Sequence, residues 1–198
     1  MNPEPRRKER VDPGDEAALV AAAQAGDEAA FAEIVKRYQR AVYRVVYALT
    51  RNASDADDLA QDTFVRAYRA LDRFRVGEPL YPWLSRIAVN LAYSLFRTRR
   101  RRPEVSIEPL VEAGQQWAAH DDPAAETADR ERSEHLRQSF AGLSPEHQSI
   151  LVLRVVQDLS YEEIAQALDI PLGTVMSRLS RARAELKARL RARTGESA

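Results

Sequence analysis

Hydroxyl and basic side chains near the C-terminus recur at a spacing that suits recognition of nucleic-acid bases. Residues 171–195 hold seven basic residues and a single acid, Glu185. On a helix that turns 100° per residue, Ser177, Ser180 and Arg181 share one pole. Small hydroxyls let a helix backbone approach the major groove of DNA, and an arginine can donate two hydrogen bonds to guanine. An amphipathic helix with a solvated basic face would look the same, so this face alone does not decide the function.

A second group of reactive side chains is acidic. Four aspartates fall within eight positions: Asp55, Asp57, Asp58 and Asp62. Such carboxylates can pair with a basic partner helix, or they can simply stabilise a helix start through the macrodipole. The aspartates lack a companion nucleophile, the three histidines lack metal-ligand spacing, and no glycine-rich phosphate loop occurs. We therefore expect no enzyme activity, no bound metal and no cofactor.

The formal net charge is zero, but the charges are segregated along the chain. Residues 97–102 contain five arginines in six positions, whereas residues 103–129 contain seven acids and no lysine or arginine. Two basic segments separated by an acidic one can meet a polyanion at two places. Cysteine is absent, the first residues lack an apolar signal segment, and no run of about 18 apolar residues occurs. These features predict a cytoplasmic protein that is not inserted in a membrane.

Four helices are predicted in the N-terminal half. Residues 1–14 are polar and contain three prolines, which predicts a disordered tail. A first helix is expected over residues 15–25, and Asp27 is placed to cap a long second helix. Ser54 with Asp57 resembles a capping box for a third helix that ends near Asp72. After a loop, Pro82 suits the first position of a fourth helix with a buried apolar stripe.

The acidic segment at residues 101–127 has no apolar period and is punctuated by Pro and Gly, so it is predicted to be a flexible linker. Helical pattern resumes near Ala128. Ser144 and Pro145 suit the start of a helix. The apolar residues of that helix are Ile150, Leu151, Leu153 and Val155.

The last part of the chain reads as a helix-turn-helix. Ser160 with Glu163 forms a capping-box pattern, and the break at residues 169–171 separates that short helix from the basic one. We therefore predict an all-α fold: two small helical domains joined by a flexible acidic linker. The expected boundaries are 15–100 and 128–193 for the domains, 101–127 for the linker and 194–198 for a C-terminal tail.

Two stretches resemble the extracytoplasmic-function (ECF) sigma factors, bacterial RNA polymerase subunits of the sigma-70 family. Residues 143–186 resemble region 4, which binds the promoter minus-35 element, and read LSPEHQSILVLRVVQDLSYEEIAQALDIPLGTVMSRLSRARAEL. Residues 25–75 and 81–92 resemble region 2, and contain DADDLAQDTFVRAYRALDRFR and YPWLSRIAVNLA. The resemblance implies a subunit that binds core RNA polymerase and directs initiation at promoter DNA.

The resemblance also implies roles for particular residues. Positions that match the docking surface for a coiled coil of the largest polymerase subunit are Asp55, Asp58, Leu59, Gln61, Asp62 and Arg66. Positions that match minus-10 recognition and melting are Phe74, Ile87, Asn90, Arg97, Arg99 and Arg100. Positions that match minus-35 recognition are Thr174, Met176, Ser177, Arg178, Ser180, Arg181, Arg183 and Lys187.

The chain departs from the family's common pattern in the minus-10 loop and in the last helix. In the loop, Val76 stands where glycine is frequent, and Pro79 and Pro82 are added. In the last helix, Met176 stands where arginine or lysine is common. The resemblance further implies an anti-sigma factor as a partner. The alternative from another functional class is a stand-alone helix-turn-helix regulator, which would bind duplex DNA without polymerase.

Overall fold

The computed structural model describes residues 13–101 and 133–194, excluding the side chains of residues 13, 14, 100, 101, 193 and 194. Within these ranges every regular element is a helix, in agreement with the all-α prediction. Most of the predicted N-terminal tail and nearly all of the linker and the C-terminal tail lie outside the described residues, as does the start of a helix near Ala128.

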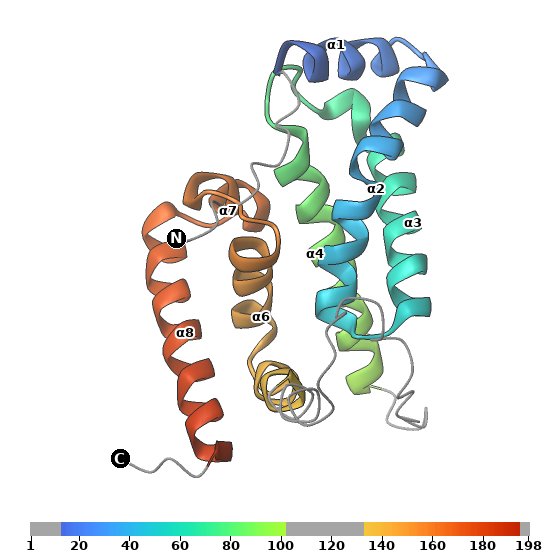
Figure 1. The fold of residues 1–198 in the computed structure, drawn as a ribbon. Helices are drawn as coiled ribbons and strands as arrows, with labels where there is room; N and C mark the ends of the chain where they lie inside the picture. The colour runs from blue at the N-terminus through green and yellow to red at the C-terminus, as the bar shows by residue number, and fades with distance from the viewer. Residues whose placement is uncertain (1–12, 102–132, 195–198) are drawn as a thin grey trace, which may run out of the picture.

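The N-terminal half forms a helical bundle (Figure 1). Its elements are α1 (Pro13–Gln24), α2 (Glu28–Thr50), α3 (Ala53–Ala70), a 3-10 turn η1 (Leu71–Arg73) and α4 (Leu80–Arg101). Helices α2, α3 and α4 run beside one another, and α1 lies across one end of them. Asp27 caps α2 as predicted, because its side chain accepts hydrogen bonds from the N–H groups of Ala29 and Ala30.

Two predicted helix starts in this bundle are wrong. Arg51 adopts a left-handed conformation with φ of 57°, and Asn52 then caps α3 by accepting the N–H of Asp55 at 2.9 Å. Ser54 and Asp57 therefore lie inside the helix and form no capping box. Helix α4 begins at Leu80, so Pro82 is its third residue, where its missing N–H is also harmless.

The C-terminal half contains a helix over residues 133–141, α6 (Pro145–Leu151), a π-helical turn η2 (Val152–Val156), α7 (Tyr161–Leu168) and α8 (Leu172–Thr194). Ser144 caps α6, and Ser160 with Glu163 forms a complete capping box, both as predicted. Val155, one of the apolar residues of this segment, is 69% exposed. The wider π-turn rotates the helix face, so that the spacing of an α-helix no longer applies there.

The turn between α7 and α8 brings the two helices into a helix-turn-helix arrangement. Asp169 ends α7 with φ of 55°, a left-handed conformation that aspartate tolerates better than bulkier residues do. Ile170 then donates its N–H back to Ala165 O at 3.1 Å. The predicted break at residues 169–171 is thus present, and α8 begins directly after Pro171.

The two halves pack against each other and share a hydrophobic core. Helix α7 lies against α4, and the η2 turn lies against α2. Tyr93 Oη donates to Pro145 O at 2.9 Å, and Tyr81 Oη donates to Gln157 Oε1 at 2.6 Å. Burial raises the pKa values of Tyr81 and Tyr93, so both phenols remain protonated donors near neutral pH.

Candidate nucleic-acid and polymerase interfaces

Helix α8 has one fully buried side. Val175, Leu179 and Ala182 recur at steps of three and four and are between 0% and 1% exposed. They pack against α6 and α7, and this contact determines which side of α8 faces solvent. This seam follows from the 100° turn per residue of a helix, which brings these three positions to the same side.

The predicted minus-35 residues lie on the other sides of α8. Exposed members of the set are Met176, Ser177, Ser180, Arg181, Arg183 and Lys187. Thr174 and Arg178 are partly buried at the edges. Arg181 lies along the helix, where its Nε donates to Ser177 O at 3.3 Å. The structure therefore brings the set together on one accessible basic surface.

The only acid of this segment, Glu185, is engaged with its neighbours. Its carboxylate accepts a hydrogen bond from Arg189 Nη2 at 2.9 Å and lies 2.7 Å from His147 Nδ1 on α6. The Arg189 guanidinium, followed by His147, lowers the pKa of Glu185. Because this negative charge is paired, it opposes the positive potential of the reading surface less than a free carboxylate would.

The predicted minus-10 set is divided between accessible and buried positions. Asn90, Arg97 and Arg99 are exposed on α4, and Ile87 is partly buried on the same helix. Phe74 is only 7% exposed, because its ring packs on Trp83 with centroids 4.9 Å apart. The Phe74 ring therefore anchors the loop to the core and has no exposed face against which a base could stack. The side chain of Arg100 lies outside the described residues.

The predicted polymerase set on α3 also divides. Asp58, Gln61, Asp62 and Arg66 are exposed, and Leu59 is partly buried against the core. Asp55 faces α4, where its two oxygens each lie 2.8 Å from a guanidinium nitrogen of Arg99. A residue expected to touch polymerase and one expected to touch DNA thus form a bidentate pair.

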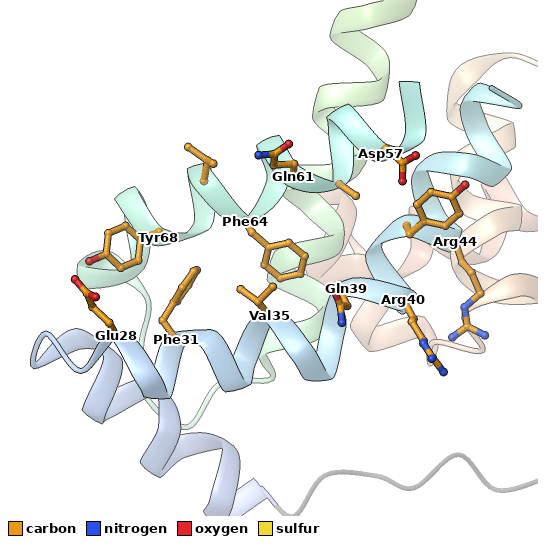
Figure 2. Close-up of a pocket in the computed structure, with 13 residues that line it drawn as sticks. Glu28, Phe31, Val35, Gln39, Arg40, Arg44, Asp57, Gln61, Phe64 and Tyr68 are labelled. Carbon is orange, nitrogen blue, oxygen red and sulfur yellow. The ribbon is translucent and has the colours of Figure 1, made fainter. Parts of the chain in front are cut away.

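A long groove runs between α2 and α3 beside this set (Figure 2). Its volume is about 1530 Å³, well above that of most small-molecule pockets. Phe31, Val35 and Phe64 point into it, and Tyr68 closes one end. The apolar floor and the length along two helices suit an amphipathic helix as occupant.

Charges of opposite sign border the groove at its other end. Arg40 and Arg44 extend from α2, and Asp57 and Gln61 extend from α3. Of the predicted docking set, only Gln61 lines the groove. A partner helix that carries both acidic and basic side chains could therefore be held in one register.

Sequence reasoning missed the apolar floor of this groove. Phe31, Val35, Val65 and Tyr68 follow the helical period as core residues do, yet Val65 is 41% and Tyr68 is 50% exposed. The sequence did contain an indication of this floor. The apolar residues of α2 and α3 cover a wider part of each helix than packing against the core requires. Periodicity alone cannot tell a core face from a docking face.

Within residues 13–101 and 133–194, none of the helices combines the length and apolar character needed to cross a membrane. In the same part of the chain, no group of three or more histidine, aspartate or glutamate side chains is arranged to hold a metal ion.

Comparison with known proteins matches both halves of the chain to one family. Residues 34–102 match Sigma-70 region 2, and residues 133–186 match Sigma-70 region 4. The ECF RNA polymerase sigma factor SigW of Bacillus subtilis is 32% identical over 173 residues, which cover 84% of this chain and 91% of SigW.

Two solved structures are also similar. CnrH in complex with the cytosolic domain of CnrY has a TM-score of 0.68 and 29% identity, covering 90% of this chain and 98% of that chain. The sigma factor RpoE of Bartonella quintana, in complex with the anti-sigma factor NepR, has a TM-score of 0.64 and 27% identity, covering 81% and 96%. Since both regions match in the same order and a relative is matched over most of its length, this chain belongs to the ECF group of the sigma-70 family, the sigma factors that bind core RNA polymerase and direct promoter-specific initiation.

Proposed function

We propose that this sigma factor reads its promoter with two separate surfaces, α8 for the minus-35 element and α4 with its preceding loop for the minus-10 element. The observation that carries this proposal is the division of α8 into a buried seam and an accessible face of hydroxyl and basic side chains. That division puts the matched residues where a major groove can meet them.

On α8, Ser177 and Ser180 allow a close approach to the groove, and Arg181 reads a base edge. Arg178, Arg183 and Lys187 bind phosphates. Thr174, near the start of the helix, completes the minus-35 set. Met176 is 56% exposed, so it presents an apolar surface where other family members present a charge. We expect it to contact a thymine methyl group or a sugar in place of a phosphate.

At the minus-10 element, Asn90 and Ile87 contact an unstacked base of the non-template strand. An amide can bond the Watson–Crick edge of a base, and an apolar side chain can lie against its face. Phe74 acts from below by holding the loop, as its burial implies. Arg97, Arg99 and Arg100 bind the backbone, which should make binding salt-dependent.

Core polymerase docks on α3 and on the groove beside it. The groove floor binds the apolar face of the coiled coil, and the exposed Asp58, Gln61, Asp62 and Arg66 set its register. When Arg99 turns toward a DNA phosphate, Asp55 becomes available to the same partner. Breaking the Asp55–Arg99 ion pair would then favour polymerase docking and promoter contact together.

Reading two elements requires the two halves of the protein to separate. Helix α7 lies between α4 and α8 and packs on both. Packed helix axes are 8–10 Å apart, so the reading helices are roughly 20 Å from each other. Promoter elements about two turns of duplex apart are separated by roughly 70 Å. The packed arrangement therefore belongs to the protein before it engages a promoter.

We keep residues 15–100 and 128–193 as the two functional domains, with residues 101–127 as the acidic linker. The similar RpoE is bound to an anti-sigma factor, and on that basis we propose an anti-sigma partner here. A sigma factor works where polymerase and DNA are, and on that basis we propose that this chain acts in the cytoplasm and performs no covalent chemistry itself. The match to both sigma regions does not favour the stand-alone regulator.

Reconstitution with core RNA polymerase tests the proposal. We expect a stable complex and new transcripts whose start sites share a minus-10 and a minus-35 sequence. A gel shift without polymerase is the companion measurement. Absence of added initiation would refute the promoter-reading role, and tight unaided binding to spaced half-sites would establish the regulator instead.

A further inference from the structure

The loop between η1 and α4 is exposed at its tip and held at both ends. Phe74 and Leu80 are 7% and 0% exposed, whereas all five residues between them are exposed. Glu78 N–H donates to Arg75 O at 3.2 Å, and Gly77 has φ of +93°, which a residue with a Cβ rarely adopts. The tip is therefore a tight turn whose placement depends on its two anchored ends.

The first end of the loop is held by Gln24, the last residue of α1. Its Nε2 donates to Leu71 O and to Phe74 O, each at 2.8 Å. The carbonyls of Leu71 and Phe74 are 47 and 50 residues away in sequence from Gln24, respectively. One amide thus joins the end of η1 to the beginning of the loop.

The second end of the loop is held by Glu16, near the start of α1. Its Oε1 accepts the N–H of Leu80 at 3.0 Å, and its Oε2 accepts a hydrogen bond from Tyr38 Oη. Leu80 is the first residue of α4, whose N–H has no partner within its own helix. A carboxylate there also suits the positive end of the helix dipole, so Glu16 caps α4 from another helix.

Both contacts come from one side of α1. Glu16, Val20 and Gln24 are spaced by four residues, and Val20 is 1% exposed. Eight residues of helix span about 12 Å, so α1 fixes the separation of the two loop ends. Figure 1 shows α1 across the end of the bundle where this loop lies.

We infer that α1 clamps the minus-10 loop, with Glu16 and Gln24 as positioning residues for base recognition. This inference rests on the proposed role of the loop and α4 at the minus-10 element. Neither residue belongs to the accessible reading surface. Their effect is to hold the loop and the first turn of α4 in one arrangement, so that the surface proposed to receive an unstacked base is formed before DNA arrives.

Initiation assays with the full chain and core polymerase test the clamp on promoters that differ by single bases in the minus-10 element. Gln24→Glu keeps the size of the side chain but places oxygens against two carbonyls, and Glu16→Ala removes the cap. Asp15→Asn is the matched control, because Asp15 is also on α1 but its carboxylate bonds Arg37 at 2.6 Å. Polymerase affinity, sensitivity to minus-35 changes and thermal stability are measured in parallel.

We expect Gln24→Glu and Glu16→Ala to reduce discrimination between minus-10 bases by about 3- to 10-fold, the effect of losing a hydrogen bond or two. Polymerase affinity and minus-35 sensitivity should match wild type, and Asp15→Asn should discriminate as wild type does. Unchanged discrimination in both clamp variants would overturn the inference. So would equal loss of every measured property, which indicates a general structural defect.

Failure of the proposed function itself would look different, since wild type would then show no preference among minus-10 bases. If Gln24→Glu does not fold, Gln24→Met provides the same test with a side chain of similar length and no donor. Glu16→Gln, which retains an acceptor oxygen, should restore most of the discrimination lost in Glu16→Ala.

Discussion

The two DNA-facing parts of this protein are built in different ways. In the C-terminal half, one side of the continuous helix α8 packs against the core. This packing by itself exposes the proposed DNA-binding residues on the opposite side. In the N-terminal half, the reading surface combines α4 with a loop whose position depends on side chains of α1. A helix face tolerates distant changes, whereas a tethered loop is sensitive to residues that never touch the ligand.

The largest effect is expected from preventing the two halves from separating. The chain has no cysteine, so Arg86→Cys and Asp169→Cys can be joined by a cleavable thiol-specific linker. These positions face each other across the interface, where Arg86 Nη2 lies 2.6 Å from Asp169 Oδ2. We expect the joined protein to lose roughly 100-fold or more of its initiation activity, because one geometry cannot engage both elements.

Cleaving the linker should restore initiation, and the same variant before joining serves as the control. If the joined protein initiates as well as the open one, the two halves need not separate and the two-surface geometry is incorrect.

The next largest effect concerns α8. Arg181→Ala should lower initiation at cognate promoters by about 10- to 100-fold and relax the preference at one minus-35 position, because a bidentate contact with a base is lost. Arg189→Ala is the control on the same helix, since Arg189 bonds Glu185. Equal effects of the two substitutions would mean that α8 contributes only general positive charge.

The groove between α2 and α3 should affect polymerase and leave the promoter preference unchanged. Tyr68→Ala is expected to weaken core polymerase binding about tenfold, because it removes an exposed aromatic from the apolar floor. Leu136→Ala is the control, as Leu136 is 47% exposed but lies outside the groove. A binding assay with labelled core polymerase would refute the docking role if both variants bound equally.

The sequence alone predicted those structural features that local rules such as helical periodicity determine. The seam of α8, the capping box at Ser160 and the break after Leu168 follow from local rules, and all three are present. The start of α3 and the exposure of Val155 do not follow from such local rules, because a left-handed Arg51 and a π-turn alter the local geometry.

The site residues divide in the same way. Ser177, Ser180 and Arg181 could be placed on one face from their spacing alone. The burial of Phe74 and the pairing of Asp55 with Arg99 could not be predicted from spacing. Phe74 is buried by Trp83, which lies further along the chain, and Asp55 pairs with a side chain of another helix. The contacts that Glu16 and Gln24 make with the ends of the loop join residues 47 to 64 positions apart, beyond the range of any local pattern.

The smallest effect concerns the pairing of Glu185. Its pKa is lowered below the ordinary value of 4.5, first by Arg189 and then by His147. A carboxyl with a lowered folded pKa stabilises the fold above its unfolded pKa, and this contribution disappears as the pH falls through the folded value. Glu185→Gln should therefore lower the melting temperature near pH 7 by at most about 3 °C, as for exposed pairs.

The difference in melting temperature between Glu185→Gln and wild type should shrink as the pH falls below 4.5 and vanish once the pH is below the lowered pKa of Glu185. Thermal unfolding at neutral and acidic pH measures it. A difference that stays constant across this range would show that the effect of Glu185 is not electrostatic.

The most direct measurement is a matrix of initiation rates with reconstituted holoenzyme. Wild type, Arg181→Ala and Asn90→Ala would each be assayed on promoters altered in the minus-35 element, the minus-10 element or both. We expect Arg181→Ala to lose sensitivity to minus-35 changes only, and Asn90→Ala to lose sensitivity to minus-10 changes only. If both variants lost sensitivity to the same element, or neither lost any, the assignment of two surfaces to two elements would be contradicted.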